Sequence, residues 1–322
     1  MVTVSDHNTR EFLAAAGWSL AAYERIAGDA SARKYFRLRQ GQQSLVLMDA
    51  SQNLESVGPF IRINEHLQRL GFSAPLIRAR DPARGFLLLE DFGNDLFSRL
   101  LEAQSEPEEL FALATDVLVA LHQHPRSIPD GLRAYHPEQM LADIELFLEW
   151  RTPDISDSGR TAFRTAWREV LPIAHRVPAS LLLRDYHVAN LMLLADREGI
   201  RRAGLLDFQD AYQGPITYDL VSLLEDARHD VPDVLRTKMI ARYLACSPAL
   251  DQKAFATSMA ILAALRHTRV LAIFERLSRR DHKHDYKQLH SARVARLLQR
   301  ALQHPALSGV KQWMERYADF GK

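Results

Sequence analysis

The sequence contains a single cysteine, Cys246, among its 322 residues. One cysteine excludes an intrachain disulfide and a zinc site built from several cysteines. The net charge is only +1, so the chain lacks the excess of positive charge that nucleic-acid-binding proteins carry. We therefore expect no nucleic-acid partner. The hydrophobic content of 47% is ordinary for a globular protein. The chain is long enough to form two lobes and a large core.

Long uninterrupted apolar segments are also missing. Residues 1–10 are polar and lack the apolar core of a signal peptide. The most hydrophobic long stretch, 259–274, contains Arg266, His267 and Arg269, which favours a buried helix over a membrane span. We expect a cytoplasmic protein that binds no membrane and is a monomer.

The first part of the chain predicts a small sheet with one main helix. Residues 7–17 read as a short helix. Short β-compatible runs separated by turn residues follow at 23–26, 35–38, 45–48, 76–79 and 85–89. Apolar residues at helical spacing predict a helix between the third and fourth of these runs: Phe60, Ile63, Leu67 and Leu70, with Gly71 ending it.

Residues 90–93 break this pattern and predict a hinge, after which the chain is mostly helical. Helices are expected at about 106–124, 136–150, 159–175, 232–245, 251–277 and 284–303. The predicted fold class is therefore α+β, with a β-rich nucleotide-binding lobe over residues 1–92 and a helical catalytic lobe over 93–322. A cleft between two such lobes would bind a nucleotide.

Three oxygen-bearing side chains stand at the ends of short apolar runs. Asp185 follows the run 181–183, Asn190 precedes 191–194, and Asp207 ends the run that begins at Ala203. A magnesium-dependent phosphoryl transferase requires this ordered set. One carboxylate accepts the proton of the attacking hydroxyl, and an amide oxygen and a second carboxylate hold Mg²⁺.

Asp219 lies in a segment in which Pro215 is suited to the first turn of a helix. A buried carboxylate must be paired with donors, because an unpaired buried charge is costly. One interpretation is that Asp219 braces the loop around Asp185 through backbone N–H groups. The other is that it is a helix N-terminal charge favoured by the helix dipole.

The segment from Gly28 to Phe36 contains one glycine, so it is not a P-loop. Its small residues, including Ser31, are followed by two cations, Arg33 and Lys34. Such a loop would let backbone N–H groups and a positive charge approach phosphates. A plain hairpin loop is the alternative interpretation.

These motifs together resemble the aminoglycoside phosphotransferase family, whose members share the protein-kinase-like fold. The resemblance covers the Gly28–Phe36 loop, the segments 90–93 and 184–190, and the segment 206–210. It implies a two-lobed fold and the use of ATP and Mg²⁺. It also implies that Asp185 is the catalytic base, that Asn190 and Asp207 bind the metal, and that the hinge near Glu90 contacts adenine.

The chain departs from the family pattern at two positions, and the first departure affects a third residue. Met48 stands where these kinases usually have a phosphate-contacting lysine, so Arg33 or Lys34 would supply that charge. Glu65, in the helix that normally pairs with that lysine, then needs another partner. Leu183 replaces a histidine that often precedes the catalytic aspartate, and this disfavours the antibiotic-modifying members.

Within the family, the overall similarity is greatest to kinases of N-acetylated amino sugars in cell-wall recycling. We therefore predict a kinase that phosphorylates the C1 hydroxyl of N-acetylmuramate, N-acetylglucosamine or both. Candidate hydrogen-bond partners of the sugar are Asp210, Tyr212, His187 and Glu145. The alternatives are a kinase for another small alcohol (an aminoglycoside, choline or homoserine) and an inactive kinase-like binding module.

Overall fold

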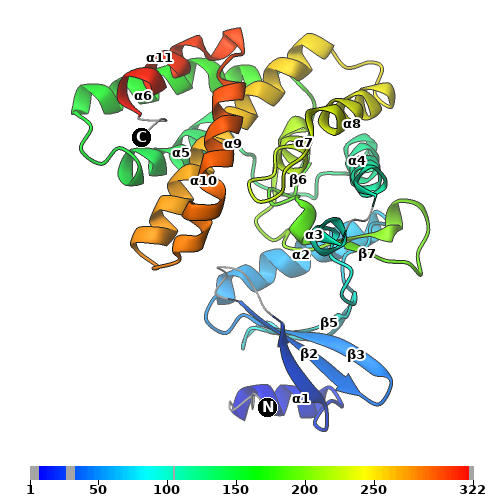
Figure 1. Cartoon of the computed structure of the whole chain (residues 1–322). Helices are drawn as coiled ribbons and strands as arrows, with labels where there is room; N and C mark the ends of the chain where they lie inside the picture. Colours follow the sequence, from blue (N-terminus) through cyan, green and yellow to red (C-terminus); the bar gives the residue numbers. More distant parts are fainter. Residues whose placement is uncertain (1–6, 27–32, 104–105, 319–322) are drawn as a thin grey trace. The chain divides into compact units, whose positions relative to one another are not determined.

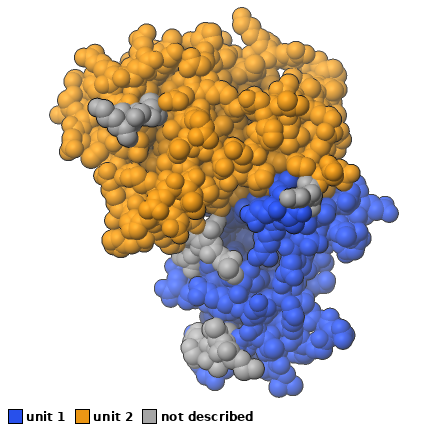
Figure 2. Space-filling view, in the orientation of Figure 1, with its two compact units in different colours: residues 1–105, 189–210 blue, residues 106–188, 211–322 orange. Residues whose placement is uncertain are grey.

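The computed structural model describes residues 7–26, 33–103 and 106–318. The chain divides into two compact units, one comprising residues 1–105 and 189–210 and the other 106–188 and 211–322 (Figure 2). The first unit thus includes the segment that carries Asn190 and Asp207. Residues 93–105 and 189–210, which the predicted lobes assign to the helical part, cluster with the β-rich part.

The first unit is built on an antiparallel sheet of five strands, as predicted (Figure 1). The strand order is β1-β2-β3-β5-β4. The strands are β1 (Ala22–Ile26), β2 (Lys34–Gln40), β3 (Gln43–Asp49), β4 (Ile77–Asp81) and β5 (Phe86–Glu90). Gly41 makes the tight β2–β3 turn, where its φ of 59° lies in the left-handed region that glycine adopts without strain.

One face of the sheet is covered by α1 (His7–Ala15). Phe12 and Leu13 of this helix belong to a buried cluster with Leu47 and Leu88 of the sheet. Successive side chains of a strand point to opposite faces. Met48, next to Leu47 in β3, therefore points to the face opposite α1.

Helix α2 (Val57–Arg69) follows a short 3₁₀ turn at Leu54–Ser56. It buries Phe60, Ile63 and Leu67, as the spacing predicted, and the chain leaves it through Gly71, whose φ is 88°. The Phe60 ring stacks on Phe208 with 5.1 Å between centroids. This contact holds the segment after Asp207 against the helix.

A short hairpin completes the first unit. It pairs β7 (Leu191–Leu193) with β8 (Ala203–Leu205), and α3 (Phe97–Glu102) precedes it in the unit. The N–H of Leu205 donates to the carbonyl of Ser73 at 2.8 Å, so the hairpin is bonded to the turn after α2.

The second unit is mainly helical. Its helices are α4 (Pro107–Gln123), α5 (Pro137–Trp150), α6 (Asp157–Val170), α7 (Thr217–Leu224), α8 (Asp233–Ala245), α9 (Gln252–Arg279), α10 (His284–Ala301) and α11 (Ser308–Tyr317). Strands β6 (Ala179–Leu182) and β9 (Tyr212–Pro215) pair antiparallel. The six helices predicted beyond the hinge are all present, whereas α3, α11 and β9 were not predicted.

Two predictions involving proline were wrong. The helix expected over 159–175 is α6, which ends at Val170, and Leu171–His175 form a 3₁₀ turn. Pro172 lies in this turn, and a proline inside an α-helix removes a backbone donor and clashes with the preceding turn. Pro215 is the last residue of β9 rather than the first turn of α7. A proline at a strand end is tolerated because little pairing is lost there.

Helix α9 forms the core of the second unit and runs beside α10 (Figure 1). By length and composition alone it would be long and apolar enough to cross a membrane. However, 72% of its apolar window is buried inside the structure. This degree of burial is typical of a core helix, which agrees with the sequence-based prediction for 259–274.

Candidate active site

Two of the predicted site residues lie at one end of the β7–β8 hairpin. Leu191 pairs with Leu205, so Asn190 directly precedes one strand and Asp207 follows the other by two residues. The N–H of Leu206 donates to the Asn190 carbonyl at 3.0 Å. Asp207 has a φ of 59°, a left-handed conformation that is uncommon outside glycine but enriched for Asp and Asn.

The carboxylate of Asp207 meets one of the two predicted loop cations. Arg33 Nη2 lies 2.5 Å from Asp207 Oδ1, and Gln209 Nε2 donates to the same oxygen at 3.1 Å. The Arg33 side chain is buried, whereas Lys34, at the start of β2, is exposed. Ser31, the third predicted phosphate-binding residue of this loop, lies outside the described residues.

Met48, at the position of the usual family lysine, is completely buried. It pairs with Tyr35 in β2 and with Leu87 in β5, and these three side chains share one face of the sheet. Burial raises the pKa of Tyr35 to about 12. The charge of Arg33 acts to lower this pKa, and the charge of Asp207 acts to raise it. Tyr35 therefore lies within electrostatic range of both members of the ion pair.

Glu65 has another partner, as the loss of the lysine requires. Its Oε1 accepts from Arg80 Nη1 at 3.0 Å, and both side chains are exposed. An exposed pair of this kind contributes little to stability. In this chain, then, Glu65 pairs with a surface arginine.

The predicted adenine-binding segment begins at Glu90, the last residue of β5. Its carboxylate pairs with Arg197 and also accepts the N–H of Leu76 at 3.1 Å. The next residue, Asp91, pairs with Arg37 of β2, whose Nε lies 2.7 Å from Oδ2. Both carboxylates are thus engaged by partners within the first unit. An adenine contact at this segment would therefore come from the backbone.

In the second unit, positive charges surround Asp185, which follows β6. Burial acts to raise the pKa of this carboxyl, but Arg266, His187, Arg269 and Arg184 together hold the pKa below its usual 3.8. Burial also lowers the pKa of His187, so the arginines carry the positive charge at neutral pH. Asp185 is therefore ionised at neutral pH.

Arg184, directly before Asp185, is held on several sides. Its guanidinium pairs with Asp143 and lies over two aromatic rings, 5.3 Å from the centroid of Tyr135 and 5.0 Å from that of Tyr212. Its carbonyl accepts from Arg266 Nη1 at 3.1 Å. Its φ of 67° lies in the left-handed region, a conformation that persists only where the surroundings determine it.

Asp219 is completely buried in α7 and faces this loop. Its two oxygens accept the backbone N–H groups of Leu183 (2.6 Å) and Arg184 (2.9 Å). Burial raises the pKa of Asp219 to about 7, against these hydrogen bonds and the charge of Arg266. The contacts are those required by the first of the two interpretations, in which Asp219 braces the loop before Asp185.

The four predicted acceptor-binding residues are not all in similar surroundings. His187 and Tyr212 are buried in the second unit. Glu145 pairs with Arg164 across two helices. Asp210 belongs to the first unit, where its Oδ2 accepts from the neighbouring Gln209 at 3.2 Å. His187 is among the charges that act on Asp185.

Asp143 on α5, two residues before Glu145, was not predicted as a site residue but contacts the loop before Asp185. Asp143 Oδ2 accepts both from Arg184 and from the Tyr135 hydroxyl, the latter at 2.8 Å. Helical spacing does not separate the two carboxylates, because Asp143 lies three residues after the buried Met140 and four before the buried Phe147, and Glu145 lies four after the buried Leu141 and three before the buried Leu148. The sequence places both at the edge of the buried stripe without showing which of them meets Arg184.

The donor set at the hairpin is suitable for Mg²⁺. Within residues 7–26, 33–103 and 106–318, no group of three or more His, Cys, Asp or Glu side chains could hold a metal. Magnesium does not require one, since it usually binds through one or two carboxylates, with phosphates and waters completing six oxygens. Asp207 and Asn190 supply a carboxylate and an amide oxygen, both hard donors.

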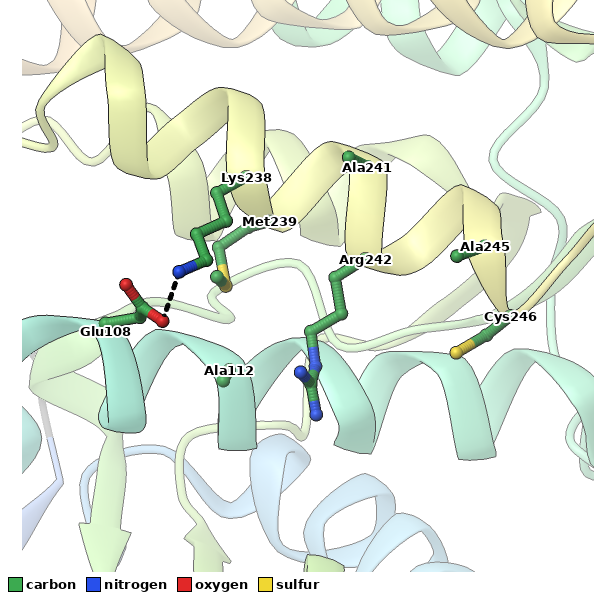
Figure 3. Close-up of a pocket in the computed structure, with 8 residues that line it drawn as sticks. All are labelled: Glu108, Ala112, Lys238, Met239, Ala241, Arg242, Ala245 and Cys246. Atoms are coloured by element: carbon green, nitrogen blue, oxygen red, sulfur yellow. Dashed lines mark hydrogen bonds and ion pairs between the residues drawn. The ribbon is translucent and has the colours of Figure 1, made fainter.

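A pocket elsewhere in the second unit involves none of the predicted site residues. It has a volume of about 550 Å³ and lies between α4 and α8 (Figure 3). An ion pair between Lys238 and Glu108 crosses it, and Arg242 reaches from α8 toward α4. Its lining consists of Glu108, Ala112, Lys238, Met239, Ala241, Arg242, Ala245 and Cys246. This set of side chains is not suited to phosphoryl transfer.

The fold is that of protein-kinase-like phosphotransferases. A choline/ethanolamine kinase family protein from Mesorhizobium loti has a TM-score of 0.64 at 16% identity, covering 95% of this chain and 98% of that one. The GDP complex of aminoglycoside 2′-phosphotransferase-IIIa has a TM-score of 0.63 at 15% identity, covering 92% and 97%. The predicted α+β, protein-kinase-like fold is confirmed.

Sequence comparison identifies the family. The model of the phosphotransferase enzyme family (APH) matches residues 22–256, and the chain belongs to this family. An N-acetylmuramate/N-acetylglucosamine kinase of Caulobacter vibrioides is 34% identical, with 95% of this chain and 94% of the relative covered. A kinase of the same name from Pseudomonas putida is 32% identical over 81% of this chain and 78% of the relative. The protein is a phosphotransferase, as predicted.

Proposed function

We propose that this phosphotransferase uses ATP and Mg²⁺ to phosphorylate the C1 hydroxyl of N-acetylmuramate, N-acetylglucosamine or both. The support from comparison is that a relative named for these two sugars matches nearly the whole chain at 34% identity. The structural observation that carries the proposal is the ionised Asp185 in a loop held by Asp219 and Arg184. We expect the protein to act in the cytoplasm as a monomer.

Asp185 is proposed as the general base. An ionised carboxylate can accept the proton of the sugar hydroxyl as the hydroxyl oxygen attacks the γ-phosphorus of ATP. The bond from the γ-phosphorus to the β,γ-bridging oxygen then breaks, and ADP leaves. Such positioned base catalysis is worth about 10²–10⁴-fold in rate. The hydrogen bonds from Leu183 and Arg184 to Asp219 favour this role, because they restrict the backbone that carries Asp185.

Asn190 and Asp207 are proposed to hold Mg²⁺. The hydrogen bond from Leu206 to the Asn190 carbonyl supports this proposal, because it fixes the backbones that bear the two oxygen donors. When bound, Mg²⁺ would neutralise the triphosphate and stabilise the charge on the transferred phosphoryl group. The proposed contribution of the chain is to orient the donors before the nucleotide arrives.

The rest of the nucleotide is proposed to bind along the sheet of the first unit. The backbone after Glu90 would contact adenine, and the loop with Ser31, Arg33 and Lys34 would contact phosphates. The buried Arg33 guanidinium supports the second part, since a guanidinium binds phosphate oxygens through two parallel hydrogen bonds.

The sugar is proposed to bind near Asp185, with His187, Tyr212, Asp210 and Glu145 as candidate hydrogen-bond partners. The charges of Arg266 and Arg269 beside Asp185 favour an acceptor that carries a carboxylate. N-Acetylmuramate has such a group and N-acetylglucosamine does not.

The test is ATP consumption by the purified protein with a panel of acceptors: the two amino sugars, choline, homoserine and an aminoglycoside. We expect turnover with the amino sugars and a sugar 1-phosphate product, identified by ³¹P NMR. The methyl glycoside of N-acetylglucosamine, in which C1 carries no free hydroxyl, should not react. Turnover of the glycoside would show that another hydroxyl is phosphorylated.

A pair of matched variants tests the role of Asp185. Asp185→Asn should lower kcat about 10²–10⁴-fold, whereas Asp154→Asn, at an exposed loop carboxylate, should leave kcat unchanged. Equal turnover in the parent and Asp185→Asn would contradict the base assignment. If ATP is consumed only with choline, homoserine or the aminoglycoside, then that alcohol is the acceptor and the sugar is not. Nucleotide binding without turnover on any acceptor would favour an inactive binding module.

A further inference from the structure

Arg33 and Asp207 form an ion pair in which the cation is buried and the anion is accessible. The Arg33 side chain is 6% exposed and that of Asp207 is 39% exposed. The pair joins residues 174 positions apart in the chain. In a surface ion pair that only stabilises a fold, both members are usually exposed.

The two loop cations point to different faces of the sheet. In β2, Lys34 alternates with Tyr35, so it lies on the face with Phe36 and Leu38, which α1 covers. Tyr35 lies on the opposite face with Met48. Arg33 lies immediately before the strand and contacts Asp207, and both charges act on Tyr35. Its positive charge is therefore on the face of the sheet where Met48 replaces the lysine.

Resting on the proposed function, we propose that Arg33 is an exchangeable counter-ion of the metal site. Without nucleotide, its guanidinium neutralises Asp207. When the metal–nucleotide complex binds, the divalent cation takes over the charge of Asp207, and Arg33 binds the phosphate oxygens instead. The exchange moves one ion pair and leaves no charge unpaired, which matters because an uncompensated charge at a half-buried site is costly.

The exchange gives two effects of opposite sign for one substitution. Arg33→Ala removes a cation that competes for Asp207, so a divalent cation alone should bind more tightly. The same substitution removes the phosphate contact, so ATP should bind more weakly. A residue that merely held Asp207 in position would weaken both, and a residue of no importance would change neither.

The experiment uses the nucleotide-free full-length protein and Mn²⁺ as a paramagnetic probe for the magnesium site. Free Mn²⁺ is followed by EPR, and steady-state kinetics give KM for ATP and kcat separately. For Arg33→Ala we expect the Kd for Mn²⁺ to fall about tenfold and the KM for ATP to rise about tenfold, the size expected for one charge-assisted contact. Arg39→Ala, at an exposed cation near the other end of β2, is the matched control and should change neither by more than about twofold.

Further variants make the outcomes decisive. Arg33→Gln, which keeps the length and polarity of the side chain, should behave like Arg33→Ala if charge is what matters. Weaker or unchanged Mn²⁺ binding in both Arg33 variants overturns the exchange. Tighter Mn²⁺ binding with an unchanged KM for ATP overturns it as well, because Arg33 would then mask Asp207 without binding phosphate.

The metal site itself is tested by Asp207→Asn. If this variant fails to weaken Mn²⁺ binding, then the proposed metal site is wrong, and with it part of the proposed function. If Asp207→Asn weakens Mn²⁺ binding and the Arg33 variants do not tighten it, only the exchange is wrong.

Discussion

Asp219 Oδ1 lies 2.9 Å from the backbone nitrogen of Arg184, the residue that directly precedes Asp185. This bond fixes an amide whose residue has a φ of 67°, a conformation that a non-glycine residue adopts only under constraint. A buried helix residue, 35 positions away in the chain, thereby sets the direction in which Asp185 leaves β6.

Replacing Asp219 should therefore affect both stability and turnover. Asp219→Ala leaves two buried N–H groups without an acceptor, which costs about 1–3 kcal/mol for each donor. Asp219→Asn keeps one oxygen but turns an amide N–H₂ group toward a backbone N–H. We expect both variants to unfold at lower urea concentration and to lower kcat more than KM.

The measurements are urea unfolding at neutral pH and steady-state kinetics on the variant that remains folded. Asp157→Asn, at an exposed carboxylate in the first turn of α6, is the control for a charge at a helix N-terminus. If Asp219→Asn resembled this control in stability and kcat, Asp219 would not brace the loop.

The sequence predicted well what depends on local pattern. Alternation and turn residues gave the five strands of the first unit, and the helical spacing of Phe60, Ile63 and Leu67 gave α2. The buried stripes likewise gave six helices of the second unit. Short elements such as α3 were missed, because six residues contain too little periodicity to distinguish a helix from a loop.

The partners within the site could not be predicted in the same way. Arg33 and Asp207 are 174 positions apart, and Asp143 and Arg184 are 41 apart. No local pattern links residues at such separations, so a single sequence identifies charged residues without showing which ones meet. The strained Arg184 was missed for a related reason, since its left-handed φ depends on tertiary hydrogen bonds and not on its residue type.

A second cluster in the helical unit predicts loss of stability in acid. Glu225 is buried and lies 2.8 Å from His267, 3.0 Å from Arg236 and 3.1 Å from Arg300. Burial opposes ionisation, but the hydrogen bond with His267 and the interactions with Arg236 and Arg300 lower the pKa of Glu225 from 4.5 to about 2. Because the folded pKa lies below the unfolded one, the stabilisation is present above pH 4.5 and is lost as the pH falls toward 2.

The effect is measurable as a difference between the parent and Glu225→Gln. A shift of this size corresponds to at most about 3 kcal/mol, since one pKa unit is about 1.36 kcal/mol. The variant should be less stable at pH 7 and should lose less further stability on acidification, as measured by urea unfolding at pH 7, 5 and 3. Parallel pH profiles for the two proteins would show that Glu225 does not stabilise the fold through its charge.

Gly204 in β8 is expected to tolerate no side chain. A Cβ at this position would lie 2.8 Å from the Phe92 ring and 3.1 Å from the Cβ of Met192. Gly204→Ala should therefore displace Phe92 and destabilise the protein by about 1–3 kcal/mol, the usual cost of overpacking. Gly58→Ala is the matched control, because Gly58 lies in α2 and a Cβ added to it would meet no atom within 4 Å. It should stabilise the protein by up to about 1 kcal/mol.

Thermal unfolding of these two variants checks the packing around the predicted hinge. Opposite shifts in Tm are expected. An unchanged Tm for Gly204→Ala would mean that the Phe92 ring moves aside without cost, and the contact would then place no constraint on this segment.

Arg269 provides a test of the acceptor itself. It lies on α9 three residues after Arg266, so both side chains are on the same face of the helix. Its Nε is 3.8 Å from Asp143 Oδ2, the oxygen that also accepts from Arg184, and its charge lowers the pKa of Asp185. Because Arg266 is bonded to the Arg184 carbonyl, Arg269 is the better placed of the two to bind an anionic substrate.

We therefore expect Arg269→Ala to raise the KM for N-acetylmuramate about tenfold, the size of one charge-assisted hydrogen bond, and to leave that for N-acetylglucosamine nearly unchanged. The neutral sugar serves as the internal control, because it lacks the carboxylate but shares the ring and the acetamido group. Arg269→Lys should recover part of the lost affinity, since it restores the charge without the planar fork. An equal rise in KM for both sugars would show that Arg269 supports the site and does not distinguish the acceptors, because only an interaction with the carboxylate can separate them.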